Sequence, residues 1–284
     1  MTGSEKNIAL VCNPTIENDK ALKAADAVVR ILKGKDIKFS IFTQYWPASW
    51  EGFTDAWIFG GDGTLNIFIN QNPNIKIPLS IFRCGSGNDF HWMLYGEDTL
   101  EQQVEKILLG KTRAVDAGVC NGQLFLNGVG IGFDGAIVKD LLGKKKLAGK
   151  ASYMLSILKN LVAFREKKFQ FEANGLSIEK ECFVISVANG QRYGGGFLVA
   201  PKASLYDSLL DLNIVGRVAP LKRMRLLPLL EKGLHVDEPF VQYEQSAFVV
   251  ITTPAEAPAH LDGEFVSATR FEIACLPQKF LFSV

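Results

Sequence analysis

The stretch Trp57-Ile58-Phe59-Gly60-Gly61-Asp62-Gly63-Thr64-Leu65-Asn66 decides the fold. Its apolar start predicts a buried strand, its glycines predict a tight turn, and a helix is expected to begin near Thr64. The N-terminus of such a helix presents free N–H groups and a positive dipole end, which together bind phosphate. The spacing matches neither standard nucleotide signature. Asp62 would also repel a phosphate unless it meets a cation, a proton or a ribose hydroxyl. The stretch alone therefore fits a phosphate site and an ordinary strand–helix turn equally well.

Strands and helices alternate on both sides of this stretch. Strands are expected at residues 7–12, 37–43, 56–59 and 77–82, and helices at residues 19–32, 64–71 and 99–109. This alternation predicts a mostly parallel sheet that is covered on both faces. A second glycine-rich turn follows the strand at residues 77–82. Ligands of such sheets bind at the carboxyl ends of the strands, so we expect both turns to face one cleft.

The pattern changes near Val115. From there short strands dominate, at residues 112–119, 123–131, 170–173, 176–178, 182–188, 211–215, 248–252 and 271–276. The turn signals Asn121-Gly122, Asn174-Gly175 and Asp262-Gly263 separate several of them. Two helices are expected, at residues 148–164 and 220–232. The predicted fold is an α/β N-terminal domain with a mostly parallel sheet (residues 1–114) and a β-rich antiparallel sandwich domain (residues 115–284).

The composition excludes several classes of protein. Of 284 residues, 48% are hydrophobic and 21% charged, and the net charge of +1 gives no general attraction to nucleic acid. The N-terminus has no signal-peptide core, and no run approaches the ~20 apolar residues of a membrane helix. The five cysteines form no C-x-x-C pair and are expected to be buried free thiols. A cytoplasmic protein is expected, with contact to the inner membrane face still open.

Further motifs follow the opening stretch in order along most of the chain. They are Gly85-Ser86-Gly87-Asn88-Asp89-Phe90, Val115-Asp116, Phe125-Leu126-Asn127, Gly130-Ile131-Gly132-Phe133-Asp134, Ala188-Asn189, Tyr193-Gly194-Gly195-Gly196-Phe197, Ala200-Pro201-Lys202-Ala203, Asp207 and Asp262-Gly263-Glu264. Together with the opening stretch, this series resembles the diacylglycerol kinase catalytic-domain family, which includes bacterial lipid kinases and sphingosine kinases. Each motif alone is weak, and the ordered series is specific.

The resemblance implies an ATP-dependent kinase that phosphorylates a lipid hydroxyl. The N-terminal domain would bind ATP and the sandwich domain the lipid, with catalysis between them. Nucleotide contacts would come from Asn13, Thr43, Gly60, Gly61, Gly63, Thr64, Leu65, Asn66, Ser86, Asn88 and Asp89. Asp62 would lie near the metal and the transferred group, and Asp262 and Glu264 stand where the family has its proton acceptor. A structural Mg²⁺ would bind Asp207 and the backbone carbonyls of Ser204 and Leu209. The implied partners are a lipid substrate and a membrane surface, without nucleic acid or a protein partner.

Several positions depart from the family's usual pattern. Ile67 stands where Glu usually follows the first glycine-rich turn, and Ser208 stands where Gly usually follows the metal-site Asp. The first loop, Asn13-Pro14-Thr15-Ile16-Glu17, lacks the usual Ser-Gly. These changes leave a non-catalytic lipid-binding relative as one alternative. A soluble kinase for NAD, which would share the Gly-Gly-Asp-Gly-Thr turn, is the other.

Two further features carry open interpretations. The basic run at residues 143–150 and the segment at residues 220–227 fit either solvated surface or contact with anionic lipid headgroups. The aromatic residues of the second domain are expected to form its core rather than a lipid channel; the examples are Phe125, Phe133, Phe171 and Phe183.

Overall fold

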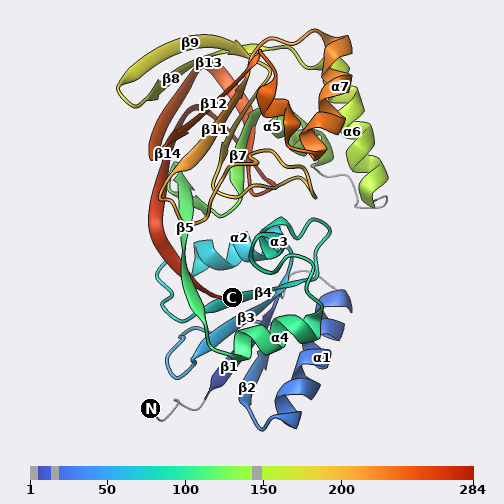
Figure 1. Ribbon diagram of the computed structural model, residues 1–284, viewed down its shortest axis with the longest axis vertical. Helices are drawn as coiled ribbons and strands as arrows, with labels where there is room; N and C mark the ends of the chain where they lie inside the picture. The colour runs from blue at the N-terminus through green and yellow to red at the C-terminus, as the bar shows by residue number, and fades with distance from the viewer. Residues whose placement is uncertain (1–5, 14–18, 143–148) are drawn as a thin grey trace. The chain divides into compact units, whose positions relative to one another are not determined.

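A computed structural model describes residues 6–13, 19–142 and 149–284 of the chain (Figure 1). It divides into two compact units. Unit 1 comprises Met1–Val115 and Gln278–Val284, and unit 2 comprises Asp116–Pro277. The division expected from the sequence assigned every residue after 114 to the second domain, whereas the C-terminal segment clusters with unit 1.

Unit 1 is built on a parallel sheet with the strand order β2-β1-β3-β4. The end of β14 extends the sheet, since Phe282 pairs with Leu79. Five of the six residues of β1 and all six of β3 are buried, as expected where helices cover both faces. The predicted α/β architecture is confirmed. The strands are β1 (Asn7–Cys12), β2 (Lys38–Phe42), β3 (Asp55–Gly60) and β4 (Leu79–Arg83).

The helices of unit 1 form two pairs, α1 with α4 and α2 with α3. In Figure 1, α2 and α3 lie above β4, and α1 and α4 lie to the right of β1 and β2. Helix α1 buries Ala21, Ala25, Val28 and Leu32, which share one helical face. The sequence did not predict α3, and α2 begins two residues earlier than expected. The helices are α1 (Asp19–Gly34), α2 (Asp62–Gln71), α3 (Asp89–Tyr95) and α4 (Leu100–Leu108).

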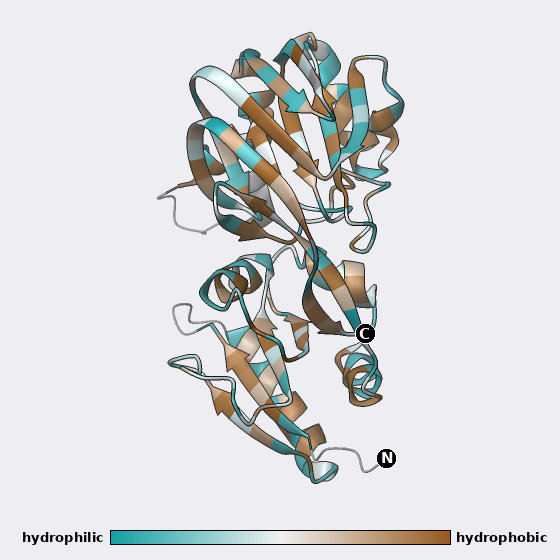
Figure 2. Cartoon of the chain, turned by 90° about the vertical axis from the view of Figure 1, so that its left-hand side faces the viewer, coloured by the Kyte–Doolittle hydropathy of each residue, from teal (hydrophilic) through white to brown (hydrophobic). Residues whose placement is uncertain are grey.

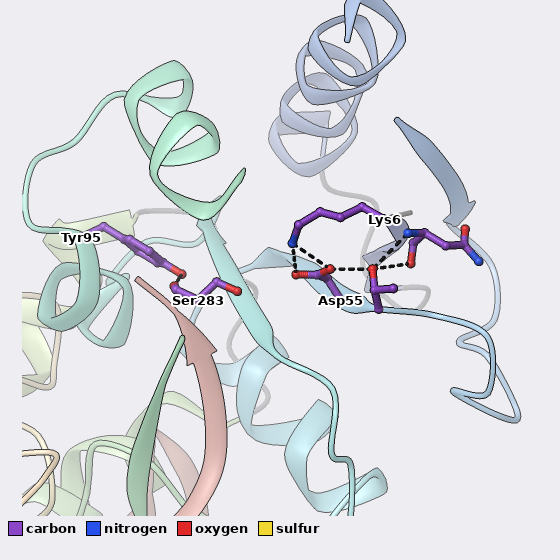
Figure 3. Close-up of polar contacts among 6 residues, drawn as sticks. Lys6, Asp55, Tyr95 and Ser283 are labelled. Carbon is purple, nitrogen blue, oxygen red and sulfur yellow. Dashed lines mark hydrogen bonds and ion pairs between the residues drawn. The ribbon is translucent and has the colours of Figure 1, made fainter. Parts of the chain in front are cut away.

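Two polar contacts join distant segments of unit 1 (Figure 3). The hydroxyl of Tyr95, at the end of α3, donates to the carbonyl of Ser283 at 2.7 Å and so fixes the C-terminal strand. The ammonium of Lys6 lies 2.9 Å from the carboxylate of Asp55 at the start of β3. Both contacts join residues that are distant in sequence.

Unit 2 consists mainly of antiparallel strands in the order β12-β11-β10-β7-β13-β14, with β8 and β9 added beside β13. Strand β13 pairs with β8 over its first half and with β7 over its second half, and its register with β14 shifts between Thr252 and Ala257. The strands enclose a core that includes Phe125, Phe171 and Phe271. The predicted antiparallel sandwich domain is confirmed.

The strand bounds of unit 2 differ from those expected. The strand expected at residues 123–131 is two strands, and those expected at 248–252 and 271–276 are parts of much longer ones. The strands are β5 (Thr112–Cys120, which begins in unit 1), β6 (Gln123–Phe125), β7 (Gly128–Gly132), β8 (Lys167–Ala173), β9 (Leu176–Cys182), β10 (Val184–Ala188), β11 (Leu210–Val215), β12 (Val241–Ser246), β13 (Phe248–Leu261) and β14 (Glu264–Ser283, which ends in unit 1).

Three helices, α5 (Phe133–Leu141), α6 (Gly149–Ala163) and α7 (Pro220–Glu231), pack in series in unit 2. A short 3₁₀ helix, η1 (Leu234–Asp237), follows α7. Figure 2 shows hydrophobic residues along the strands and alternating polar and hydrophobic residues on helices. All five cysteines are buried and free, as predicted. Within the described ranges, no helix has the length and hydropathy needed to cross a membrane.

Candidate active site

The first group of candidate residues lies where the chain leaves β1 and β3 in opposite directions. From β1 the chain continues to β2 on one side, and from β3 it continues to β4 on the other. Ligands of open α/β sheets bind at the carboxyl ends of strands at such a reversal. Asn13 follows β1 there, and its amide Nδ2 lies 3.4 Å from Thr64 Oγ1, in the first turn of α2.

The backbones of two glycines, Gly61 and Gly85, pack closely against each other at this site. A Cβ placed on Gly61 would lie 2.8 Å from the Cα of Gly85, and one on Gly85 would lie 2.5 Å from the Cα of Gly61. Real Cβ atoms do not approach so closely, so both positions require glycine. Gly61 also caps α2 without a side-chain hydrogen bond. The N-terminus of α2 therefore meets a turn of exposed backbone, which suits a phosphate group.

Asp62 joins the two glycine-rich turns. Its carboxylate accepts hydrogen bonds from the backbone N–H of Asp89 at 3.1 Å and of Phe90 at 2.9 Å, at the start of α3. The side chain of Asn88 closes the second turn, because its Oδ1 accepts from Gly85 N at 2.8 Å and its Nδ2 donates to Gly85 O at 3.0 Å. The structure thus brings the two turns together, and it gives Asp62 a positioning role that the sequence did not indicate.

The remaining candidates of unit 1 differ in their surroundings. Leu65 and Asn66 are buried in α2, and the backbone and side-chain oxygens of Asn66 accept from Asn70 Nδ2. Thr43 and Ser86 are exposed. Among the described residues, no hydrogen bond joins either of these two side chains to the other candidates. They can contact a ligand only as side chains that face solvent.

In unit 2, Asp262 and Glu264 belong to the tight turn between β13 and β14. Asp262 and Gly263 have positive φ values of 47° and 90°, typical of a two-residue hairpin turn. The Asp262 carboxylate accepts from the backbone N–H groups of Leu126, Asn127 and Gly128 at 2.8–2.9 Å. Glu264 is exposed. The two acids that the sequence treated together therefore differ: Asp262 holds backbone, and Glu264 faces solvent.

The loop that carries the candidate metal ligands is also held by backbone contacts. Asp207 is exposed, and its Oδ1 accepts from Leu209 N at 3.1 Å. Ser208, at a φ of 64°, donates its N–H to the Asp116 carboxylate at 2.7 Å. Among the described residues, no group of three or more His, Cys, Asp or Glu side chains could hold a metal. An ion at this loop would depend on the Asp207 carboxylate and on carbonyl oxygens such as those of Ser204 and Leu209, ligand types that suit Mg²⁺.

Unit 2 also contains an apolar pocket that the sequence did not predict. Its walls come mainly from α5, α6, α7 and β10, and the space between them is about 880 Å³ when the open solvent at its mouth is included. Phe133 and Phe183 are buried in one core cluster, as predicted, and they also line this pocket, with their ring centres 4.4 Å apart. Phe125 and Phe171 belong to another core cluster, also as predicted. The sequence does not reveal which part of the core borders a pocket, because core and pocket walls use the same residue types.

One positive charge in the pocket wall is fully compensated. The buried guanidinium of Arg223 lies 2.7 Å from Glu166 and stacks 4.4 Å from the ring centre of Phe183. It also donates to the carbonyls of Leu161 and Phe164. Arg223 therefore braces α6 against α7 and is not one of the solvent-facing charges expected in residues 220–227.

Two family models match the chain over most of its length. The model described as diacylglycerol kinase catalytic domain matches residues 7–120. The model described as YegS C-terminal NAD kinase beta sandwich-like domain matches residues 127–282, more than half of the chain. The chain belongs to the diacylglycerol kinase catalytic-domain family. This membership indicates a kinase, a phosphotransferase, as the sequence motifs predicted.

Individual relatives agree with this family. The chain is 26% identical over 288 residues to the diacylglycerol kinase of Mycobacterium tuberculosis (strain ATCC 25618 / H37Rv), covering 95% of this chain and 92% of the relative. It is 30% identical over 226 residues to the probable lipid kinase YegS of Escherichia coli (strain SMS-3-5 / SECEC), covering 77% and 74%.

Solved structures share the fold of this diacylglycerol kinase family member. A diacylglycerol kinase from Bacillus anthracis str. Sterne has a TM-score of 0.75 at 21% identity and covers 100% of this chain and 98% of its own. Yeast NADH kinase in complex with NADH has a TM-score of 0.51 at 10% identity, covering 96% and 79%. At these identities the likeness concerns the fold alone.

Proposed function

We propose that this family member transfers the γ-phosphoryl group of ATP to a hydroxyl of a lipid. The observation that carries the lipid acceptor is the apolar pocket in unit 2, whose walls are mainly Phe, Leu, Ile and Val side chains. Burying an alkyl chain there stabilises binding by ~0.8 kcal/mol per CH₂ group. Among the described residues of this wall, a charged dinucleotide would find one cation, Arg223, and that cation is already paired with Glu166.

The nucleotide phosphates bind in unit 1, at the N-terminus of α2. The close approach of the Gly61 and Gly85 backbones supports this proposal, because neither residue has a side chain that would keep a ligand away from the main chain. Asn13 and Thr64 supply side-chain polar groups at the same edge of the sheet. Asp62 acts chiefly by holding the start of α3 against the first turn. Magnesium, when bound, neutralises phosphate charge.

Glu264 is the general base. As the lipid oxygen forms its bond to the γ-phosphorus, the bond to the bridging oxygen breaks, ADP leaves, and Glu264 takes the hydroxyl proton. Its exposure supports the role, because an exposed carboxylate is open to a substrate. Asp262 positions the turn through its three backbone contacts. The Asp207 carboxylate, with the carbonyls of Ser204 and Leu209, would hold a structural Mg²⁺.

The enzyme works at the surface of a membrane on the cytoplasmic side. Helices α6 and α7 expose apolar side chains, with Leu158 39%, Val162 60% and Met224 52% accessible. Exposed Lys222 and Arg225 lie on α7 beside Met224. This combination suits an anionic lipid surface. Residues 143–148 of the basic run lie outside the described residues.

The test is phosphate transfer from labelled ATP, with Mg²⁺, to a panel of lipid alcohols in detergent micelles. NAD in the same buffer is the soluble alternative acceptor, which the fold likeness to yeast NADH kinase motivates. Label in a lipid and none in NAD is expected. Label in NAD alone would establish a soluble nucleotide kinase. Binding to lipid vesicles without any transfer would favour a non-catalytic relative, which Ile67 motivates.

A further inference from the structure

Several polar side chains interrupt the apolar lining of the pocket in unit 2. Asn213 and His235 hydrogen-bond to each other, and Arg223 is paired with Glu166. The other polar residues of the described lining are Asp134, Ser186, Tyr193 and His260. They come from α5, from β10, from the segment after β10 and from β13. Polar groups placed in an apolar pocket fix the orientation of a ligand and give specificity. The question is which ligand group these four would recognise.

The first three form a chain of hydrogen bonds with a fixed direction. The Tyr193 hydroxyl donates to Asp134 Oδ2 at 2.9 Å. Ser186 Oγ lies 2.8 Å from the same hydroxyl. A phenol has one proton, and Tyr193 uses it on Asp134, so Ser186 is the donor in the second bond. The chain holds the Asp134 carboxylate as a hydrogen-bond acceptor.

His260 supplies a donor. Its Nδ1 accepts from the backbone N–H of Gly263 at 3.3 Å. A backbone N–H can only donate, so Nδ1 carries no proton and Nε2 does. Burial lowers the pKa of His260 to about 4, which keeps the ring neutral at pH 7. The ring packs edge-on against Tyr193, with 5.2 Å between centres.

Gly130 on β7 brings the donor and the acceptor together. A Cβ placed on Gly130 would lie 2.5 Å from His260 Nε2 and 2.8 Å from Asp134 Oδ2. Both side chains therefore lie against the backbone of Gly130, in space that a side chain on residue 130 would take. Among the described residues, His260 Nε2 has no hydrogen-bond acceptor, and the Asp134 carboxylate has no donor besides Tyr193.

We propose that Asp134 and His260, with Tyr193, form a polar anchor that binds a hydroxyl group of the lipid. A hydroxyl both donates and accepts, so it satisfies the carboxylate and the imidazole N–H together, whereas an ammonium can only donate and an ester carbonyl can only accept. The anchor therefore selects uncharged lipid alcohols such as acylglycerols over long-chain amines. The inference rests on the proposed lipid acceptor.

Two further observations support the anchor. Desolvation raises the pKa of Asp134 to about 6, against the opposing effect of the Tyr193 hydrogen bond, so a ligand donor would relieve an unfavourable carboxylate. The Gly263 N–H that fixes the His260 ring also lies next to Glu264 in the chain. A hydroxyl held by the anchor is thereby placed near the turn that carries the proposed base.

The test is equilibrium binding without ATP, using three probes with the same alkyl chain. They are 1-monooleoylglycerol, with hydroxyl groups; oleylamine, with an ammonium; and methyl oleate, with an ester alone. The wild type is expected to bind monooleoylglycerol at least ~10-fold more tightly than either other probe, the factor that one hydrogen bond to a charged group supplies. Asp134→Asn and Tyr193→Phe should each reduce this preference several-fold and leave methyl oleate affinity unchanged.

A matched control separates recognition from pocket shape. Val138→Ala removes an apolar lining side chain, so it should shift all three affinities by the same factor. Tyr193→Phe keeps the aromatic ring, so it remains informative if Asp134→Asn does not fold. Equal probe preferences in the wild type and the variants would overturn the anchor, and so would tighter binding of oleylamine. Neither result would overturn the proposed lipid kinase activity, which the phosphate-transfer assay tests separately. Failure of every probe to bind would overturn the anchor and the lipid acceptor together.

Discussion

The carboxylate of Asp262 accepts a hydrogen bond from the backbone N–H of Asn127 at 2.9 Å, across 135 positions of sequence. The neighbouring N–H groups of Leu126 and Gly128 donate to the same carboxylate. In return, the Asp262 N–H donates to the carbonyl of Gly128. Asp262 thus fixes the turn between β13 and β14 onto the segment between β6 and β7, and it leaves Glu264 as the acid open to solvent.

Asp262→Asn should destabilise the protein. Asparagine has the same size and also tolerates the positive φ of this turn, so the change isolates the carboxylate. One carboxylate oxygen becomes an NH₂ group that faces backbone donors, and the expected loss is about 2–3 kcal/mol of unfolding free energy. Urea denaturation measures it. An unchanged midpoint would show that these three contacts do not hold the turn.

Asp62→Asn should reduce both stability and turnover. From the sequence alone a cleft aspartate would be expected to affect turnover only. In the structure its two oxygens hold the start of α3, so the substitution should cost about 2 kcal/mol in unfolding free energy as well. Thermal melting with and without ATP separates the two effects. Full turnover together with a normal melting temperature would show that Asp62 contributes neither to catalysis nor to the stability of the turn.

Removal of Mg²⁺ should lower the melting temperature if the Asp207 loop holds the ion. Saturating Mg²⁺ is expected to stabilise the wild type by about 2 kcal/mol over an EDTA-treated sample. Asp207→Asn should abolish that difference. Asp237→Asn, at an exposed acid of η1, is the control and should retain it. Identical melting of the wild type with Mg²⁺ and with EDTA would count against a structural ion.

Ser208→Gly should stabilise the protein. Ser208 has a φ of 64°, a left-handed conformation that costs a residue with a Cβ roughly 1–2 kcal/mol. Glycine avoids this cost and keeps the N–H that donates to Asp116, and part of the gain is lost to the flexibility of the unfolded chain. A net gain of about 0.5–1 kcal/mol is expected by urea denaturation. Ser177→Gly in β9 is the control and should lose stability.

The sequence predicted the architecture well where local patterns determine it. Apart from the missed helix α3, the strands and helices up to residue 109 alternate as expected. The three turns at Asn121, Asn174 and Asp262 also form as expected, and each of these residues has a positive φ. The predicted strand lengths were wrong for β13 and β14, which continue through Pro254, Pro258 and Pro277. Pairing with several neighbours and a register shift maintain these strands, and neither is visible in a local pattern.

The sequence predicted the candidate active site only where backbone atoms form it. The glycines at positions 61 and 85 are needed for a close backbone approach, which a glycine-rich sequence signals. The structural role of Asp262 depends on residues more than 130 positions away. The pairing of Asp134 with Tyr193 joins α5 to the segment after β10 across 59 positions, which no local pattern indicates.

The most direct test of the central claim compares the wild type with Glu264→Gln in transfer of labelled phosphate from ATP to 1-monooleoylglycerol micelles. Glu264 is exposed, so the substitution should leave the melting temperature unchanged. The account predicts labelled lipid with the wild type and a loss of at least ~100-fold with the variant, the contribution typical of a general base. Equal transfer by both proteins, or label in NAD in place of lipid, would contradict it.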